Sequence, residues 1–241
     1  MKVLLLAAGR GTRISRYLNG NPKCTVDIGD EKLIQYTIKM LNKKGIKDIA
    51  MVLGYRADII KKTLKDFDIK YFYNPFFDVT NSIASAWFAK SFIENDDILI
   101  MNADVFLGEQ LMDYILEKKK SPVMFADSSR KEEADYKFKF ENGILLKYGK
   151  ELEGDDISGE YVGIGRFDKI FMKEFLVKLE EMIETQQHSV WWENVVYNLS
   201  SKKEIKVDDV KGMFWAEVDY IEDYERILNY RGIESNLVTN I

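Results

Sequence analysis

The stretch that decides the fold is LLLAAGRGTRISRYLNGNPKCTVDI, Leu4 to Ile28. It starts as an apolar run, breaks into glycine and arginine, passes through a polar segment, and reaches Pro22-Lys23 before a second apolar run. A continuous apolar run that ends at small residues is typical of a strand buried on both faces of a parallel sheet. We therefore expect Lys2 to Ala7 to form the first strand, with the glycines at its carboxyl end.

Beyond this stretch, helix and strand patterns alternate through the first half of the chain. Helical spacing is expected at 31–44, 57–65 and 82–91, and strands at 48–53, 70–73 and 97–101. Alternation with short connections predicts right-handed crossovers and ligands at the carboxyl ends of the strands. The fold class is therefore α/β, with a Rossmann-like, doubly wound, mostly parallel mixed sheet.

After Ser121 the pattern indicates antiparallel structure. Strands are expected at 123–126, 136–140, 144–148, 161–167, 205–207 and 213–218, and helices at 169–183, 194–199 and 221–230. Asn142-Gly143 is a type I′ hairpin signal between two of these strands. No repeat or Pro-rich or Ser-rich linker marks a boundary, so we expect one domain, 1–241. It would consist of a core at about 1–120 and 210–241 and a small α+β lobe at about 121–209.

Composition narrows the class of protein. A chain of 241 residues with 46% hydrophobic content can bury a sizeable core. A net charge of -5 gives no broad basic surface, so nucleic acid is not an expected partner. The single cysteine forms no internal disulfide, and the N-terminus carries no signal-peptide pattern, so we expect a reducing, cytoplasmic compartment. No apolar run approaches the roughly twenty residues that span a bilayer, so no membrane partner is expected.

The glycine loop, Ala8 to Arg13, follows the first predicted strand. Glycines let backbone amides approach an anion closely, which suits a phosphate site. The two common fingerprints are absent, because there is no G-x-x-x-x-G-K-[ST] and a G-x-G-x-x-G would need glycine at Ile14. Taken alone, the loop is equally well explained as a tight turn.

Two cations give the loop a chemical role. Arg13 and Lys23 flank the polar stretch Ser15 to Asn21, which we interpret as a flexible cover. Pro22 is expected to hold Lys23 at the start of a following strand. In nucleotidyl transfer, positioning and neutralisation of phosphate charge supply most of the rate, and an arginine and a lysine beside a glycine loop suit that task.

Three carboxylates are expected near the same edge of the sheet. Asp104 ends the strand pattern ILIMNAD, and Glu217 and Asp219 stand two residues apart in a late strand, so they share a face. Magnesium prefers one or two carboxylates with water and substrate phosphates. Acidic residues at strand ends are otherwise simply solvated.

LAAGRGTR followed by PK resembles the signature of the nucleotide-diphospho-sugar pyrophosphorylase superfamily, nucleotidyltransferases that join an NTP to a phosphorylated acceptor. Other matching segments are GYR from Gly54, NPFFDVTNSIAS from Asn74, NADVF from Asn102, GEYVGIGRF from Gly159, WWENVV from Trp191 and AEVDYIEDYERI from Ala216. Together they are most similar to the small phosphocholine-type cytidylyltransferases. The resemblance implies a GT-A-like nucleotidyltransferase fold.

The resemblance also implies roles for individual residues. Lys23 would orient the attacking phosphate, Arg13 would neutralise the leaving pyrophosphate, and Asp104 and Asp219 would bind Mg²⁺, with Glu217 as a direct or indirect partner. The residues implied at the nucleotide are Leu6, Ala7, Ala8, Gly9, Gly11, Gly54, Tyr55, Asn81, Ser82 and Ser85. Asn81 and Ser82 are also suited to cap the helix that begins there.

The resemblance places the acceptor in the lobe, at Glu160, Trp191, Glu193 and Trp215. Aromatic faces beside a carboxylate suit a quaternary ammonium or an amine. A Trp-Trp pair, however, also suits a core, and Glu193 suits a sugar hydroxyl.

The expected enzyme is a Mg²⁺-dependent cytidylyltransferase, a monomer or homodimer that joins CTP to a small phosphorylated acceptor for capsule or cell-surface polysaccharide decoration. Phosphocholine is the favoured acceptor. The alternatives are phosphoethanolamine, 2-aminoethylphosphonate, an amidophosphate such as phosphoglutamine, inositol phosphate and a sugar 1-phosphate. An inactive nucleotide-binding regulatory subunit is a further hypothesis, against which the intact Arg13, Lys23, Asp104 and Asp219 argue.

Overall fold

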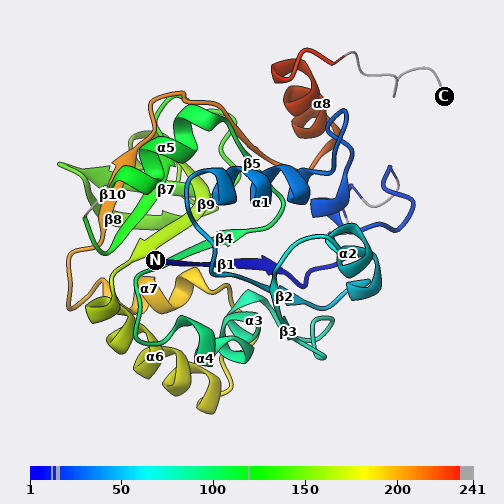
Figure 1. The fold of residues 1–241 in the computed structure, drawn as a ribbon. Helices are drawn as coiled ribbons and strands as arrows, with labels where there is room; N and C mark the ends of the chain where they lie inside the picture. Colours follow the sequence, from blue (N-terminus) through cyan, green and yellow to red (C-terminus); the bar gives the residue numbers. More distant parts are fainter. Residues whose placement is uncertain (12, 15–16, 119, 234–241) are drawn as a thin grey trace.

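The computed structural model describes residues 1–11, 13–14, 17–118 and 120–233. The larger sheet is formed by β1 (Lys2–Ala7), β2 (Ile49–Leu53), β3 (Lys70–Tyr73), β4 (Ile98–Asn102), β6 (Val123–Asp127), β7 (Lys137–Glu141), β8 (Ile144–Gly149), β9 (Gly159–Phe167) and β10 (Lys206–Asp209). The strand order is β3-β2-β1-β4-β9-β6-β10-β8-β7 (Figure 1). A second sheet pairs β5 (Val105–Leu107) with β11 (Trp215–Glu217).

Strand β1 is central because it is apolar on both faces. It runs parallel to β2 on one side and to β4 on the other. Its side chains alternate between faces, so Leu4 joins one core cluster while Val3 and Leu5 join the other. All three are fully buried, which confirms the predicted two-sided burial.

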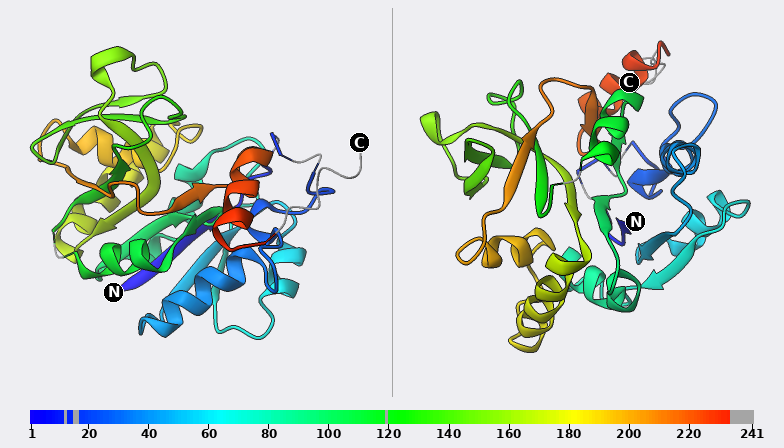
Figure 2. Two further views of the ribbon diagram at one scale, coloured as in Figure 1. Left: turned by 90° about the horizontal axis from the view of Figure 1, so that it is seen from above. Right: turned by 60° about the vertical axis from the view of Figure 1, so that its left-hand side comes forward.

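The second half of the sheet is mixed. Strand β9 lies antiparallel between β4 and β6, and β10 runs parallel to β6 and antiparallel to β8. The β7–β8 hairpin turns at Asn142-Gly143, where φ is 50° and 71°, so both residues have the positive φ that a type I′ turn requires. Figure 2 shows this hairpin, in green, on the opposite side of the molecule from β2 and β3.

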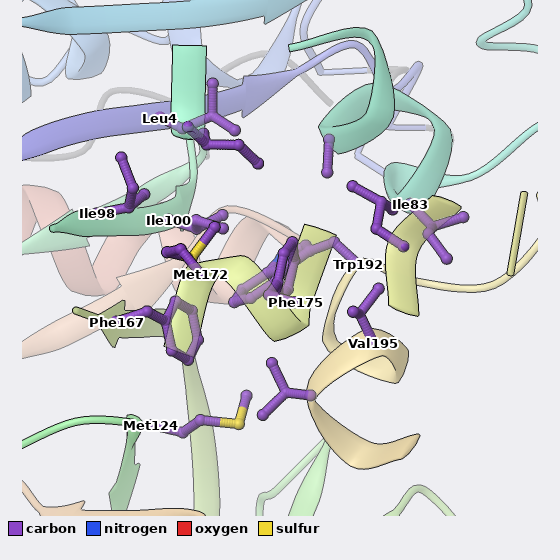
Figure 3. Close-up of a cluster of buried hydrophobic side chains, with 14 of the residues drawn as sticks. Leu4, Ile83, Ile98, Ile100, Met124, Phe167, Met172, Phe175, Trp192 and Val195 are labelled. Carbon is purple, nitrogen blue, oxygen red and sulfur yellow. The ribbon is translucent and has the colours of Figure 1, made fainter. Parts of the chain in front are cut away.

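Helices cover both faces of the sheet (Figure 1). One face carries α1 (Leu33–Lys43), α2 (Ala57–Thr63) and α5 (Glu109–Glu117), and the other carries α3 (Ser82–Phe88), α4 (Lys90–Ile93), α6 (Lys169–Glu184) and α7 (Glu193–Leu199). Helix α8 (Ile221–Tyr230) packs near β5 and β11. Figure 3 shows the core beneath α6 and α7, where Phe175 and Trp192 lie among the side chains of the sheet. None of the described helices is long and apolar enough to cross a membrane.

The structure corrects the prediction for Lys23. Lys23–Thr25 is a 3₁₀ helix and not the start of a strand. The amide of Thr25 donates to the carbonyl of Pro22 at 2.9 Å, and the φ of Pro22, -61°, suits entry into a helical turn. The turn matters for the site because it directs the lysine back toward the glycine loop. Ser15 and Arg16 of the predicted cover lie outside the described residues.

Other differences are local. The predicted helix 82–91 is interrupted at Ala89 and becomes α3 and α4, and the predictions omitted β5 and α5. The late strand predicted at 213–218 is confined to Trp215–Glu217, because the Asp219 amide turns back to the Glu217 carbonyl at 2.9 Å.

Candidate active site

A cavity of about 540 Å³ opens where β1 and β4 end. Fifteen of the sequence-predicted site residues line it, namely Leu6, Ala7, Ala8, Gly9, Gly11, Arg13, Lys23, Asn81, Ser82, Ser85, Asp104, Trp191, Glu193, Glu217 and Asp219. They come from the parallel strands, the helix α3 and the lobe, so the fold brings distant segments to one place. Gly54, Tyr55, Glu160 and Trp215 do not line this cavity.

Gly11 makes room for the lysine. Its φ is +62°, and a Cβ added there would lie 2.6 Å from Cε of Lys23 and 2.7 Å from its Cγ. The glycine therefore has a steric reason that the sequence pattern does not reveal, in addition to any approach of backbone amides to phosphate. Lys23 itself is half-buried, and its stem lies against the glycine loop.

Gly54 and Tyr55 support the loop from behind. The Tyr55 amide donates to the carbonyl of Ala8 at 3.0 Å, and its hydroxyl donates to the carbonyl of Gly20 at 3.1 Å. A Cβ at Gly54 would lie 2.7 Å from the oxygen of Ala8, so the two segments touch backbone to backbone. The Arg10 guanidinium lies 5.4 Å from the Tyr55 ring centroid. In this structure Gly54 and Tyr55 contact the loop and do not line the cavity.

Lys23 and Arg13 meet the predicted metal-binding carboxylates. The Lys23 ammonium lies 3.4 Å from Oδ2 of Asp104 and also contacts Oδ1 of Asp219. Nη1 of Arg13 lies 2.9 Å from the second oxygen of Asp219 and 3.4 Å from Asp135. Asp219 therefore joins both cations.

Burial and charge shift the pKa values of these groups. Burial opposes the charge of Lys23, but Asp104 and Asp219 outweigh it and raise the pKa of the lysine. Burial raises the pKa of Asp104 against the attraction of Lys23. Burial, together with Asp104 and Asp219, raises the pKa of Glu217 well above its ordinary value. The carboxyl groups of Asp104, Glu217 and Asp219 therefore share this wall of the cavity with Lys23 and Arg13.

The arrangement of these carboxyl groups decides whether the site fits a metal ion. Asp104 and Asp219 offer hard oxygen donors beside a cavity that admits phosphates, which matches the few carboxylates that Mg²⁺ uses. The three carboxylates do not form one cluster, however. Lys23 stands between Asp104 and Asp219, and Oε1 of Glu217 accepts from Asn102 at 3.3 Å. Among the described residues, no group of three or more His, Cys, Asp or Glu side chains is arranged to hold a metal ion.

One end of the cavity is lined by the start of α3. Asn81 caps the helix through its side chain, which accepts from the Ser82 amide at 2.7 Å. Ser82 Oγ accepts from the Trp192 amide at 2.9 Å, and Ser85 Oγ accepts from Asn74 at 3.1 Å. Asn81 therefore caps the helix, and Asn81, Ser82 and Ser85 also line the cavity.

Sequence reasoning missed part of this end. Asn74, Phe77 and Thr80 also line the cavity. Asn74 is 1% exposed, and its amide bonds Thr80 and Ser85, so it shapes the wall and is committed to internal contacts. Its signal was available, because NPFF directly follows β3, at the same edge of the sheet as the glycine loop.

The other end of the cavity is aromatic. The structure separates the Trp-Trp pair. Trp192 is buried in the core (Figure 3), while Trp191 is 41% exposed and lines the cavity. Tyr136 meets the Trp191 ring edge-on at a centroid distance of 5.5 Å. Tyr161 adds a third ring, and its buried hydroxyl has no hydrogen-bond partner among the described residues. Tyr136 was missed as a cavity-lining residue.

Glu193 lies at this aromatic end. It is 6% exposed, and burial raises its pKa to about 8, while its own backbone and the neighbouring Tyr161 hydroxyl act in the opposite direction. A buried carboxyl with no cationic partner is costly when ionised. A ligand with positive charge would relieve that cost.

Glu160 and Trp215 lie elsewhere. They line a smaller cavity of about 80 Å³, which Glu217 and Asp219 also line. Glu160 is bound to Arg130 at 2.7 Å and accepts from the Asp135 amide at 2.9 Å, and Trp215 donates to Asp127 at 2.9 Å. These contacts occupy the polar atoms of Glu160 and Trp215, and neither residue lines the main cavity.

Known proteins with a similar sequence show the family of this chain. The sequence profile of the MobA-like NTP transferase domain matches residues 3–192. The chain belongs to this family. The transferase is 26% identical to the CTP:phosphoglutamine cytidylyltransferase of Campylobacter jejuni, over 93% of this chain and 98% of that protein. It is 22% identical to the choline-phosphate cytidylyltransferase of Streptococcus pneumoniae, over 94% and 96%.

Solved structures show the same fold as this transferase. The CTP:phosphocholine cytidylyltransferase of Streptococcus pneumoniae superposes with a TM-score of 0.79 at 20% identity, covering 95% of this chain and 98% of that one. The inositol-1-phosphate CTP transferase of T. maritima superposes with a TM-score of 0.76 at 18% identity, covering 97% and 98%. The α/β nucleotidyltransferase fold is thereby confirmed, and the protein is a nucleotidyltransferase.

Proposed function

We propose that this transferase joins CTP to a small phosphorylated acceptor, with Mg²⁺, and releases pyrophosphate. The observation that carries the proposal is Lys23, held between Asp104 and Asp219 in a cavity with a glycine loop on one side and aromatic rings on another. The choice of CTP as the nucleotide is supported by two relatives that are named as cytidylyltransferases.

The proposed reaction is an in-line displacement. An oxygen of the acceptor phosphate attacks the α-phosphorus of CTP, a new P–O bond forms, and the bond to the β-phosphate oxygen breaks so that pyrophosphate leaves with the electron pair. No protein nucleophile is needed. Rate comes from positioning and from charge placed where it develops.

Each cation has a distinct place in this scheme. Lys23, which lines the cavity with its ammonium beside Asp104 and Asp219, binds and orients the attacking phosphate. Arg13, at the end of the loop, neutralises the leaving pyrophosphate. Both cations are bound to Asp219 here, so substrate phosphates would compete with that carboxylate for them.

Asp104 and Asp219 are the residues proposed to hold Mg²⁺, with Glu217 beside them. When bound, the ion would neutralise triphosphate charge and fix its orientation. The carboxyl groups that line this wall of the cavity support the assignment. Leu6 to Gly9, Gly11, Asn81, Ser82 and Ser85 are the proposed nucleotide contacts, and Gly54 and Tyr55 hold the loop.

The acceptor is proposed to occupy the aromatic end. Trp191, Tyr136 and Tyr161 supply ring faces and Glu193 a carboxyl, which together suit a positively charged nitrogen group. Phosphocholine fits that description, as do phosphoethanolamine, 2-aminoethylphosphonate and phosphoglutamine. Inositol phosphate and sugar 1-phosphates lack the charge that Glu193 would pair with. The product would serve to decorate a capsule or cell-surface polysaccharide.

An acceptor panel tests the proposal. The protein is incubated with Mg²⁺, CTP and each candidate acceptor in turn, and products are read by mass spectrometry together with a pyrophosphate assay. The expected result is a CDP-linked product and equimolar pyrophosphate with at least one nitrogen-bearing acceptor. Silence over all acceptors and all four NTPs would favour an inactive nucleotide-binding subunit.

A further inference from the structure

A buried carboxyl group and a lysine ammonium both line the aromatic end of the cavity. Glu193 is buried near the Tyr161 hydroxyl and forms no salt bridge with a cation among the described residues. Lys150 lines the same cavity, with its ammonium 5.9 Å from the ring centroid of Trp191. Trp191 in turn meets Tyr136 edge-on. A ligand seated on this pair therefore lies between a carboxyl and a lysine.

The backbone holds Lys150 in this position. Lys150 follows directly after β8, and its carbonyl accepts from the ammonium of Lys137 at 2.9 Å, as does the carbonyl of Leu152 at 3.0 Å. The side chain ends on Asp135 at 2.7 Å. The loop is therefore tied down while the ammonium remains at the cavity surface.

Lys150 can exchange its ion pair with Asp135 for a contact with a ligand. The two side chains are 38% and 47% exposed, and exposed ion pairs contribute little to stability. Asp135 also lies 3.4 Å from Arg13, so it retains a cation if the lysine turns to a ligand. Exchange of Asp135 for an anionic group of the acceptor costs little.

We propose that Lys150 selects an acceptor whose head carries a carboxylate as well as an ammonium, that is, a phosphorylated amino acid or amino-acid amide. This inference rests on the proposed function. The ammonium would lie against Glu193 and the rings, and the carboxylate would reach Lys150. A head with an ammonium alone leaves the lysine without a ligand partner and adds a like charge beside it. Phosphocholine then becomes a poorer acceptor than a zwitterionic one.

The test uses pairs of acceptors that differ by one carboxylate. One pair is O-phosphoserine and phosphoethanolamine, and the other is N-phosphoglutamine and the N-phosphoryl amide of 4-aminobutyric acid. For each acceptor, kcat/KM is measured with CTP and Mg²⁺ for the wild-type protein, Lys150→Met, and Lys147→Met. Lys147 lies on the same hairpin, pairs with Asp156 and does not line the cavity, so its variant is the matched control.

The expected preference for the carboxylate-bearing member of a productive pair is about tenfold, the low end for a hydrogen bond between charged groups. Lys150→Met should remove that preference, and Lys147→Met should retain it. Because Lys150 is exposed, its variant should keep the wild-type circular dichroism spectrum. The wild-type ratio alone is informative even if it does not.

Two results would overturn the inference while leaving the proposed function intact. In the first, the wild-type protein uses the decarboxylated members or phosphocholine as well as or better than the zwitterions. In the second, Lys150→Met lowers kcat/KM equally for both members of a pair, which would make the lysine a contact of the phosphate. Absence of any CDP product from every acceptor would instead remove the proposed function, and this inference with it.

Discussion

Replacement of Gly11 by alanine should damage catalysis far more than stability. The added methyl would lie 2.6 Å from Cε of Lys23, where ordinary contacts are 3.4–4 Å, so the lysine must move by about 1 Å. A displacement of that size from the reactive geometry costs roughly a hundredfold in rate. The positive φ of +62° adds backbone strain of about 1–2 kcal/mol to the folded state.

Gly154→Ala is the matched control for the strain. Gly154 has a φ of +54°, and nothing lies within 4 Å of its added Cβ. The assay is kcat and KM for CTP and for the acceptor that the wild-type protein uses best, with unfolding by urea in parallel. Both variants should lose similar stability, and only Gly11→Ala should lose about two orders of magnitude in kcat/KM. The reasoning fails if Gly11→Ala keeps the control's activity, or if it raises the KM for CTP alone, since the methyl would then obstruct the nucleotide.

Three further predictions follow from separate contacts. The folded protein keeps a proton on Glu193 to about pH 8, whereas the unfolded chain releases it near pH 4.5, so this group makes stability fall as pH rises between those values. Glu193→Gln should flatten that part of the pH profile of urea unfolding, and an unchanged profile would contradict the assignment. The neighbouring Tyr136, Tyr161, Tyr197 and Glu217 also have raised pKa values, and they remain in the variant. Tyr55→Phe removes the hydrogen bond to Gly20 and should raise the KM for CTP by about two- to tenfold, with exposed Tyr73→Phe as the control that should show no rise. Asp168 accepts from the amides of Ile170 and Phe171 at the start of α6, so Asp168→Ala should cost about 1 kcal/mol in thermal unfolding while Asp168→Asn retains the cap, and equal losses would refute the capping role.

The sequence predicted most of the fold because its elements are strongly patterned. Strand β1 and helix α8 have the predicted bounds, since each is set by a long apolar run or by periodic burial against one face. The turn at Lys23 was missed because its conformation is set by Pro22 and by backbone hydrogen bonds, which leave no periodic signal. Helix α5 was missed although its apolar residues, Leu111, Met112 and Ile115, have helical spacing.

The site was predictable where one motif supplies both backbone and chemistry. The glycine loop and Asp104 follow the ends of β1 and β4, so strand topology alone brings them together. The lobe gave a poorer result. Glu160 and Trp215 stand in apt motifs but point to a smaller cavity, while Tyr136 and Lys150 reach the main cavity from a hairpin whose packing no local pattern specifies.

The reaction itself is tested most directly by following oxygen. An acceptor whose phosphate carries ¹⁸O in its non-bridging positions is incubated with the protein, CTP and Mg²⁺. The masses of the CDP-linked product and of pyrophosphate are then measured by mass spectrometry. Attack by the acceptor phosphate on the α-phosphorus predicts a CDP-linked product that retains every ¹⁸O atom and pyrophosphate that contains none. Label in pyrophosphate or in released orthophosphate, or the absence of a CDP-linked product from every acceptor, would contradict it.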